Sequence, residues 1–94
     1  MKFEWDTEKA NTNQEKHGVG FDEAKTVFDD TLAYIFNDEW NSFGENRELI
    51  IGLSHQKRLL IVSFTERQET LIRIISSRLA TSKERKDYEQ HRRY

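Results

Sequence analysis

The sequence predicts one α+β domain over residues 1–94, and three observations support this. At 94 residues and 11.3 kDa, the chain has the size of one domain with one core. Only 35% of the residues are hydrophobic and 34% are charged, so the apolar side chains must be concentrated in few elements. They form short runs bounded by polar turns in the middle of the chain, while both ends carry helix signals. We therefore expect a short N-terminal strand, two helices, a four-stranded antiparallel meander and a C-terminal helix.

The first third of the chain predicts the strand and the two helices. Aromatic residues alternate with charged ones over residues 3–5, as in a half-buried strand. A helix over 6–17 begins at Asp6, a preferred N-cap, and ends at Gly18, which readily adopts the left-handed conformation of a C-cap. The stretch 21–28 has apolar residues at i, i+3, i+6 and i+7, which predicts a second, amphipathic helix.

The remainder of the chain predicts the meander and the last helix. The compact apolar run over 32–36 is typical of a strand buried on both faces, and the polar stretch 39–46 predicts a loop. Three further strands are expected, over residues 47–54, 59–65 and 70–76. Their connections are too short for a parallel crossover, so the strands should be antiparallel. Thr81 and Glu84 have the spacing of a capping box at the start of a polar helix.

Charge is distributed unevenly along the chain. The net charge is only −2, but residues 1–66 hold seven Lys or Arg and thirteen Asp or Glu (net −6). Residues 67–94 hold eight and four (net +4), which favours an anionic partner such as a phosphate-bearing molecule. There is no apolar run of signal-peptide or membrane-span length and no cysteine, so we expect a cytoplasmic protein without disulfides.

The motifs that would indicate a cofactor or a metal are missing from the sequence. It contains no phosphate-binding glycine loop, dinucleotide fingerprint, zincin motif or serine elbow. The three histidines, His17, His55 and His91, fall on separate predicted elements without a recognised ligand spacing. We therefore expect neither an organic cofactor nor a metal.

Four arginines lie in or beside the predicted strands, and a planar guanidinium suits phosphate. Arg73 interrupts the apolar run LIRIIS, where a charge is costly unless an anion or a carboxylate meets it. A structural ion pair with one of the 17 acidic residues is the alternative explanation. The set consists of Arg47, Arg67, Arg73 and Arg78.

Candidate groups for proton transfer are fewer. His17 ends the first predicted helix, where it serves either as a cap residue or as a general acid or base. Asn13, one turn earlier, is predicted to orient its ring. Tyr88 either packs the last helix or directs its phenol at the basic surface, and the charge run 83–87 is by default a solvated face.

The chain resembles the BrnT family, the toxin half of a bacterial type II toxin–antitoxin pair, over residues 3–89. The similar segments are WDTEKANTNQEKHGVGFDEA, GENRELIIGLS and TERQETLIRIISSRLATSKERKDYE. Two departures are small: Ser77 stands where the family usually has Ala, and the hairpin after Ser54 lacks the Gly often seen there.

This resemblance implies a RelE/ParE-like fold and a cofactor-free, metal-independent ribonuclease that arrests translation by 2′-hydroxyl attack on the adjacent phosphate. It also implies neutralisation by a BrnA-like ribbon-helix-helix antitoxin in a 2:2 assembly that contacts promoter DNA only through the antitoxin. With the residues above, it predicts a catalytic set of His17, Arg47, Arg67, Arg73 and Arg78. The predicted RNA-binding set is Lys16, Lys83, Arg85 and Tyr88. The alternatives are a non-catalytic, antitoxin-bound co-repressor and a ParE-like gyrase poison.

Overall fold

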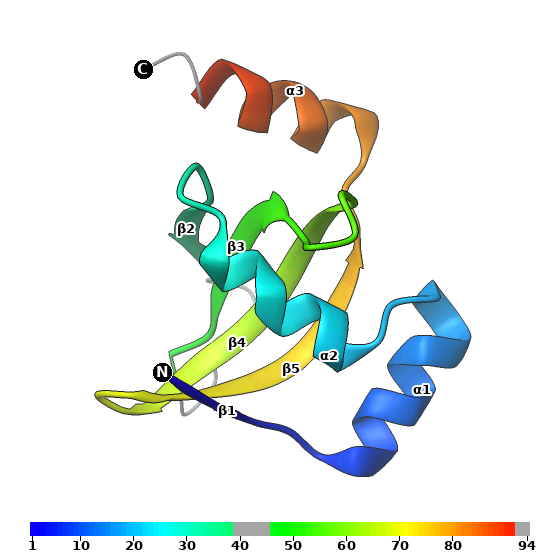
Figure 1. Cartoon of the computed structure of the whole chain (residues 1–94), viewed down its shortest axis with the longest axis vertical. Coiled ribbons are helices and arrows are strands. Elements are labelled where there is room, and N and C mark those ends of the chain that lie inside the picture. Colours follow the sequence, from blue (N-terminus) through cyan, green and yellow to red (C-terminus); the bar gives the residue numbers. More distant parts are fainter. Residues whose placement is uncertain (39–45, 92–94) are drawn as a thin grey trace.

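The computed structural model describes residues 1–38 and 46–91, and it has the predicted α+β class (Figure 1). The predicted loop 39–46 lies outside the described residues, except for its last residue. No helix in the described part of the chain is long and apolar enough to cross a membrane. In chain order the elements are β1 (Lys2–Glu4), α1 (Thr7–His17), α2 (Phe21–Ala24), the 3₁₀ helix η1 (Lys25–Asp29), β2 (Tyr34–Asn37), β3 (Glu48–Leu53), β4 (Leu59–Gln68), β5 (Leu71–Leu79) and α3 (Ser82–His91).

The strands form one sheet in the order β1-β5-β4-β3-β2. The pairs β2–β3, β3–β4 and β4–β5 are antiparallel, as expected of the predicted meander, and for the last two pairs the short connections predicted it. The N-terminal strand joins the opposite edge, where β1 runs parallel to β5 and Phe3 lies opposite Ile72. The sheet therefore has five strands, with the first strand of the chain beside the last.

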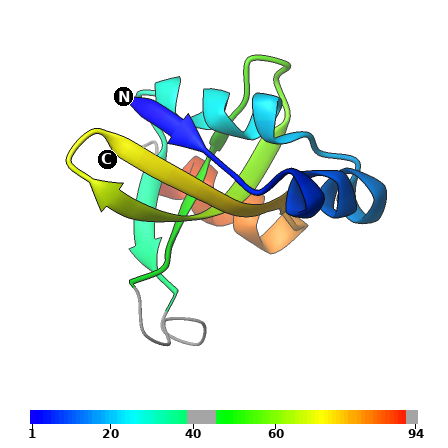
Figure 2. The same cartoon turned by 90° about the horizontal axis from the view of Figure 1, so that it is seen from below.

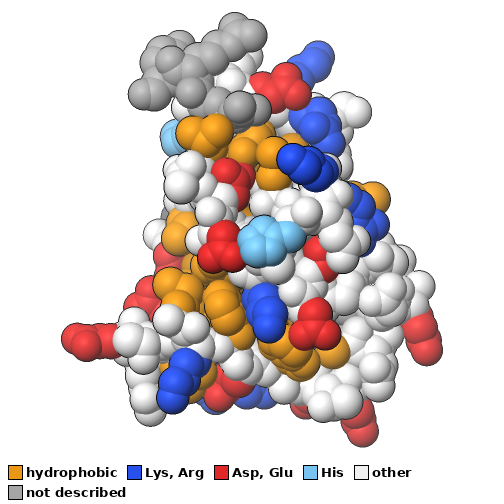
Figure 3. Space-filling model, viewed as in Figure 1, with side chains coloured by type: hydrophobic (Ala, Val, Ile, Leu, Met, Phe, Trp, Pro, Cys, Tyr) orange, Lys and Arg blue, Asp and Glu red, His pale blue; other side chains and the backbone are white. Residues whose placement is uncertain are grey.

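Helices lie on both sides of this sheet (Figure 2). One face, with Val62 and Phe64 of β4, packs against Phe21 and Val27 of α2 and η1 in the larger core cluster. The other face carries a smaller cluster that includes Ile61 and Tyr88 of α3. On the face with α2 and η1, acidic, basic and apolar side chains are interspersed (Figure 3). Because α3 covers only part of the second face, side chains beyond it stay accessible.

The strand predicted over 32–36 is not buried on both faces, and that prediction is wrong. The strand is β2, the last in the sheet order, and Ile35 is 52% and Phe36 40% exposed. The apolar run resembles a central strand in composition, but it is paired with a neighbour on one side only. Residues 31–32 form a turn rather than the start of the strand.

A β-bulge in β5 determines which side chains reach the second face. Phe64 is paired with Ile74 and Ser63 with Ser76, so Ile75 is an extra residue between the two pairs. With strict alternation, Arg78 would face the larger core, as Ile74 does. The extra residue reverses the alternation, so that Arg78 is paired with Ile61 on the opposite face.

Candidate active site

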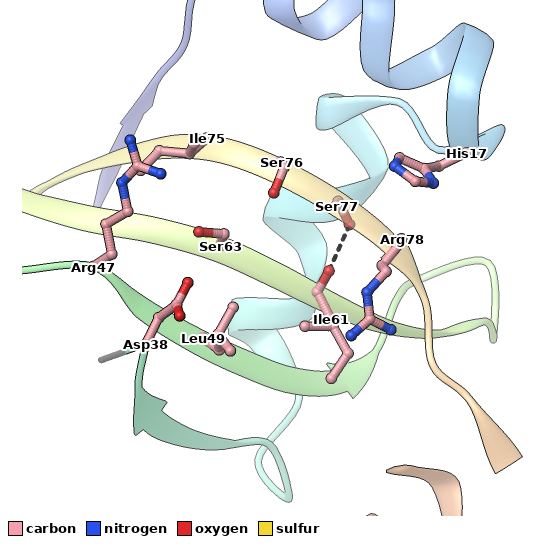
Figure 4. Close-up of a pocket in the computed structure, with 10 residues that line it drawn as sticks. All are labelled: His17, Asp38, Arg47, Leu49, Ile61, Ser63, Ile75, Ser76, Ser77 and Arg78. Carbon is pink, nitrogen blue, oxygen red and sulfur yellow. Dashed lines mark hydrogen bonds between the residues drawn. The ribbon is translucent and has the colours of Figure 1, made fainter. Parts of the chain in front are cut away.

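A cavity of about 620 Å³ lies on the second face of the sheet (Figure 4). Its walls come from five elements or their ends, so it forms only in the folded chain. The lining residues are His17 from α1, Asp38 after β2, Arg47 before β3, Leu49 from β3, Ile61 and Ser63 from β4, and Ile75, Ser76, Ser77 and Arg78 from β5. Three residues of the predicted catalytic set, His17, Arg47 and Arg78, are thus brought together.

The caps of α1 place His17 at the rim of this cavity. The Asp6 carboxylate accepts hydrogen bonds from the backbone N–H of Glu8 (2.8 Å) and Lys9 (3.2 Å), as an N-cap should. At the other end, Gly18 adopts a left-handed φ of +66° and donates its N–H to the carbonyl of Gln14 at 2.9 Å. Both predicted caps are confirmed, and the helix therefore ends with the exposed imidazole of His17.

Asn13 does not orient the ring of His17, contrary to prediction. Its side-chain amide is buried and donates to the backbone carbonyls of Val19 (2.9 Å) and Ser77 (2.8 Å). Its Oδ1 atom accepts a hydrogen bond from the Ser77 N–H at 3.0 Å. The amide is used to attach α1 to β5, because a buried polar group requires partners and the backbone of Ser77 offers them.

Arg78 is held in place by Glu84 of α3. The guanidinium donates to both carboxylate oxygens, at 2.8 and 2.9 Å. These bonds lower the pKa of the Glu84 carboxyl to about 2, against an opposing effect of burial, and Glu84 raises the pKa of Arg78. Glu84 also accepts from the Thr81 N–H at 2.8 Å, which confirms the predicted capping box. The arginine is therefore fixed in one orientation and stays charged.

Arg47 lies at the opposite end of the cavity. In Figure 4 the hydroxyls of Ser63 and Ser76 lie between Arg47 on one side and His17 and Arg78 on the other. Arg47 precedes β3, and its carbonyl accepts the Asp38 N–H at 2.9 Å. The arrangement sets two guanidinium groups at the two ends of a small polar floor, which suits a ligand with distributed negative charge.

A second cavity, of about 360 Å³, adjoins the first along α1. Both cavities are lined by His17, Ile75 and Ser76, so they form one continuous depression. Lys9, Thr12 and Lys16 line the added part. Lys16, predicted to bind RNA, is therefore next to the candidate site.

Two arginines of the predicted catalytic set lie elsewhere. Arg73 donates to the Glu4 carboxylate at 2.7 Å, and the Nε of Arg67 lies 3.7 Å from the same oxygen. Arg73 and Glu4 are also paired across β1 and β5. Neither arginine lines either of the two cavities described above, and Arg73 forms the structural ion pair that was the alternative explanation for it.

Three residues predicted to bind RNA also lie away from the cavity. Tyr88 is only 2% exposed, and its hydroxyl donates to Asp30 Oδ2 at 2.6 Å. Of the two alternatives predicted for Tyr88, packing of the last helix is confirmed and a phenol directed at the basic surface is not. The ring packs on the sheet and supplies the apolar contact that α3 otherwise lacks. Lys83 and Arg85 are exposed on α3 and line neither of the two cavities.

Some features of the site were not found from the sequence. Asp38, Ser63 and Ser76 line the cavity, but only the strand register shows which face they occupy. A buried Glu23 accepts hydrogen bonds from Arg58 and Ser54, and the bonds from Arg58 contribute most to lowering its pKa. Arg58 also donates to the Gly18 carbonyl at 3.0 Å and thus supports the turn after His17.

Comparison with known proteins identifies the family of this chain and a structure with a similar fold. A family model described as the ribonuclease toxin, BrnT, of type II toxin–antitoxin systems matches residues 5–84. The chain belongs to the BrnT family. The crystal structure of the Brucella abortus ribonuclease toxin BrnT is similar, with a TM-score of 0.67 and 26% sequence identity, over 87% of this chain and 99% of that one. No curated protein matches the chain. The resemblance of the three sequence segments to BrnT toxins is confirmed, and membership implies an antitoxin partner.

Proposed function

We propose that this BrnT family member cleaves RNA without a metal ion, in the cavity that joins His17, Arg47 and Arg78. The observation that carries the proposal is the meeting of one imidazole with two guanidinium groups on a polar floor. In the proposed reaction a ribose 2′-oxygen attacks the adjacent phosphorus and the bond from phosphorus to the 5′-oxygen breaks. The products are a 2′,3′-cyclic phosphate and a 5′-hydroxyl, so one proton leaves the 2′-hydroxyl and one reaches the leaving oxygen.

Each residue of the cavity has a role in this proposal. His17 takes the proton from the 2′-hydroxyl and returns it to the leaving 5′-oxygen, since imidazole is the side chain best suited to proton transfer near neutral pH. Arg47 and Arg78 stabilise the additional negative charge of the pentavalent phosphate, a contribution of about 10²- to 10³-fold for one preorganised donor. Ser63 and Ser76 offer hydroxyl hydrogen bonds to the phosphate or the ribose. Among the described residues, no three His, Asp or Glu side chains are grouped so that they could hold a metal ion.

The remaining predicted residues have supporting roles. We propose that Lys16, in the adjoining cavity, binds the phosphate of a flanking nucleotide. Lys83 and Arg85, exposed on α3, add long-range attraction for RNA. We assign Arg67 and Arg73 to the attachment of β1 through Glu4 rather than to the reaction.

The antitoxin is the second part of the proposal. We propose a BrnA-like ribbon-helix-helix protein that covers the cavity, in a cytoplasmic assembly of two toxins and two antitoxins. Such antitoxins are dimeric, which supports the two-fold arrangement. Contact with promoter DNA is then made by the antitoxin alone.

Incubation of the purified protein with end-labelled RNA in the presence of EDTA tests the reaction. We expect cleavage products that carry 2′,3′-cyclic phosphate, and their loss in Arg78→Gln. Lys25→Gln is the matched control, because it removes an exposed cation from η1 and lines neither cavity. Cleavage that requires a divalent metal would contradict the proposed mechanism, and no cleavage at all would favour the non-catalytic co-repressor.

Expression of the chain without its antitoxin tests the cellular function. We expect growth to stop, with loss of protein synthesis before any loss of DNA supercoiling. Continued protein synthesis while DNA breaks accumulate would favour the gyrase poison instead.

A further inference from the structure

A buried asparagine joins the two elements that carry the candidate catalytic groups. Asn13 is the one buried residue of α1, with 6% of its surface exposed. It faces the part of β5 that follows Arg73, where β5 is paired with β4 on one side but has no strand on the other, because β1 ends at Glu4. Ser77 is 1% exposed, so its backbone N–H and carbonyl on this open side need hydrogen-bond partners other than water.

The Asn13 side chain acts on Ser77 as a neighbouring strand would. Its amide donates to the Ser77 carbonyl at 2.8 Å and its oxygen accepts from the Ser77 N–H at 3.0 Å. The second amide hydrogen is directed at the Val19 carbonyl, at 2.9 Å. An amide is required here, because one acceptor and two donors are needed together at a single short side chain.

These three bonds fix the end of α1 against β5. His17 is one helical turn after Asn13, and Val19 follows the Gly18 cap, so both sides of His17 are held. Ser77 immediately precedes Arg78. We propose that Asn13 is a positioning residue that sets the place of His17 relative to Arg78; this inference rests on the proposed function.

Apart from the Asn13 bonds, this end of α1 is supported mainly from outside the helix, by Val19 after the cap, which is 0% exposed in the larger core, and by Arg58. Ala10 is the residue of α1 that packs beside the larger core, almost two turns before the C-terminus. Arg58 holds the Gly18 carbonyl, but from a side chain that is itself 36% exposed. Arg78, by contrast, is fixed on its own element by the pairing with β4 and by Glu84. A change at Asn13 should therefore displace His17 and leave Arg78 in place.

Asn13→Asp tests the inference, because it keeps the shape and removes both donors. A displacement of about 1 Å at a catalytic group costs up to about 10²-fold in rate. We expect kcat for RNA cleavage to fall by about 10- to 100-fold. Because Asn13 also lines the second cavity beside Lys16, the KM comparison is made with the uncharged variant Asn13→Gln, for which KM should change by less than about threefold. Asn11→Asp, the same substitution at an exposed position of α1, is the matched control and should leave both constants near wild type.

A double-mutant cycle separates positioning from general stability. In a His17→Gln background, displacement of α1 has no imidazole left to misplace, so Asn13→Asp should cost no more than about threefold in kcat. If Asn13→Asp lowers kcat by the same factor with and without His17, the inference is overturned. It is also overturned if Asn13→Asp alone cleaves RNA at the wild-type rate. A wild-type chain that does not cleave RNA would contradict the proposed function itself.

Asn13→Gln provides a second variant, with the amide kept but moved outward by one methylene. All assays are made well below the unfolding temperature, which is measured for each variant. We expect Asn13→Gln to be folded and slow, without the added charge of the aspartate. If both variants are unfolded at the assay temperature, Asn13 is a residue of the fold alone and the inference is wrong.

Discussion

Arg78 and Glu84 form a closed pair at the rim of the cavity, with two nearly parallel hydrogen bonds. A guanidinium that is already oriented loses little rotamer freedom when a phosphate arrives, which favours stabilisation of a transition state. The carboxylate also neutralises part of its charge in the free protein. Arg47, which approaches from the other end, is therefore a necessary second cation in the proposed mechanism.

His17 and the arginines can be distinguished by their response to pH. Arginine stays protonated over the accessible range, whereas imidazole side chains in general titrate near pH 6.5. If His17 transfers the proton, the rate of RNA cleavage should show an inflection as the pH is varied. His17→Gln should lower the rate by about 10²- to 10⁴-fold and remove the inflection.

Arg78→Lys is the comparison for this experiment, because it changes the charge donor and keeps the imidazole. It should cleave slowly with the inflection retained. Should His17→Gln cleave at the wild-type rate, His17 is only the last residue of its helix, and the reaction depends on the cations alone.

At the residue scale, the position of His17 could be predicted from the sequence, because Gly18 ends the helix and so makes His17 its last residue. The arginines were chosen by residue type, and only Arg47 and Arg78 of the four reach the cavity. The extra residue Ile75 turns Arg78 toward the face that carries the cavity, whereas the carboxylate of Glu4 pairs with Arg73 away from it. Neither the bulge nor an ion pair between residues 69 positions apart has a local signal in the sequence.

The helix α3 is attached to the body by a few specific contacts. Besides the buried Tyr88 ring in the smaller core cluster, they include the Arg78–Glu84 pair and the bond from the Tyr88 hydroxyl to Asp30. The rings of Tyr34 and His91 are also in contact, with centroids 4.1 Å apart. Asp30 also accepts the Leu53 N–H at 2.8 Å, so one carboxylate joins α3 to β3. The attachment of this element should therefore depend on pH.

We expect the attachment of α3 to weaken in acid. The pKa of Glu84 is about 2 in the folded protein against 4.5 ordinarily, so its contribution is complete above about pH 4.5 and is lost as the pH falls toward 2. Because the Arg78 side chain is 42% exposed, screening by water reduces this contribution to about 1–2 kcal/mol. Denaturant unfolding of wild type and Glu84→Gln at several pH values measures it.

Glu84→Gln should lose less unfolding free energy than wild type between pH 5 and 2. Glu89→Gln, at an exposed position of the same helix, should follow the wild-type curve. Parallel curves for wild type and Glu84→Gln would show that the pair with Arg78 contributes nothing to stability.

The turn between β3 and β4 contains a residue in an unfavourable backbone conformation. Lys57 has a φ of +67° and donates its N–H to the Ser54 carbonyl at 2.9 Å. Lys57→Gly relieves this conformation but adds freedom to the unfolded chain, so the unfolding free energy should change by less than about 1 kcal/mol. Lys57→Val should lower it by about 1–2 kcal/mol, because a β-branched residue is an outlier at positive φ.

Thermal or denaturant unfolding of the two Lys57 variants measures the difference. Equal stability of the glycine and valine variants would mean that the turn is not left-handed in solution. Gln56→Val, one position earlier, controls for the valine side chain itself.

At the element scale, the meander and both caps of α1 were predictable, because short connections force antiparallel pairing and Asp6 and Gly18 act on adjacent backbone. The environment of β2 was not. An apolar run such as residues 32–36 is the same in a central strand and at an edge, and only the sheet order distinguishes the two. The stretch 21–28 also divides into one turn of α-helix and a 3₁₀ helix. The spacing of its apolar residues does not distinguish these two kinds of helix.

For the whole molecule, the division of charge along the chain does not become a division between two faces. Acidic and basic side chains are interspersed on the side of α2 and η1 (Figure 3), and several cations of residues 67–94 are paired with acids. The cations that line the two adjoining cavities are Lys9, Lys16, Arg47 and Arg78. These four residues are the ones that we expect an acidic segment of the antitoxin to meet.

Association with the antitoxin should therefore slow as the ionic strength rises, because oppositely charged surfaces steer the encounter and salt screens them. Stopped-flow mixing from about 50 mM to about 500 mM salt covers the range in which screening sets in. Lys16→Gln should flatten the dependence and Lys25→Gln, at an exposed position of η1, should not. An association rate indifferent to salt would mean that the contact is mainly apolar and leaves the cavity free.

The pairing of β1 with β5 has a consequence for the order of events during synthesis. Residues 2–4 are made well before their partners, residues 71–73, and Asn13 is made well before Ser77, to which it is hydrogen-bonded. Contacts between distant parts of a chain close late and slowly. The depression between α1 and the sheet cannot be completed until Arg78 has left the ribosome, so a nascent or truncated chain that stops before β5 should be harmless to the cell that makes it.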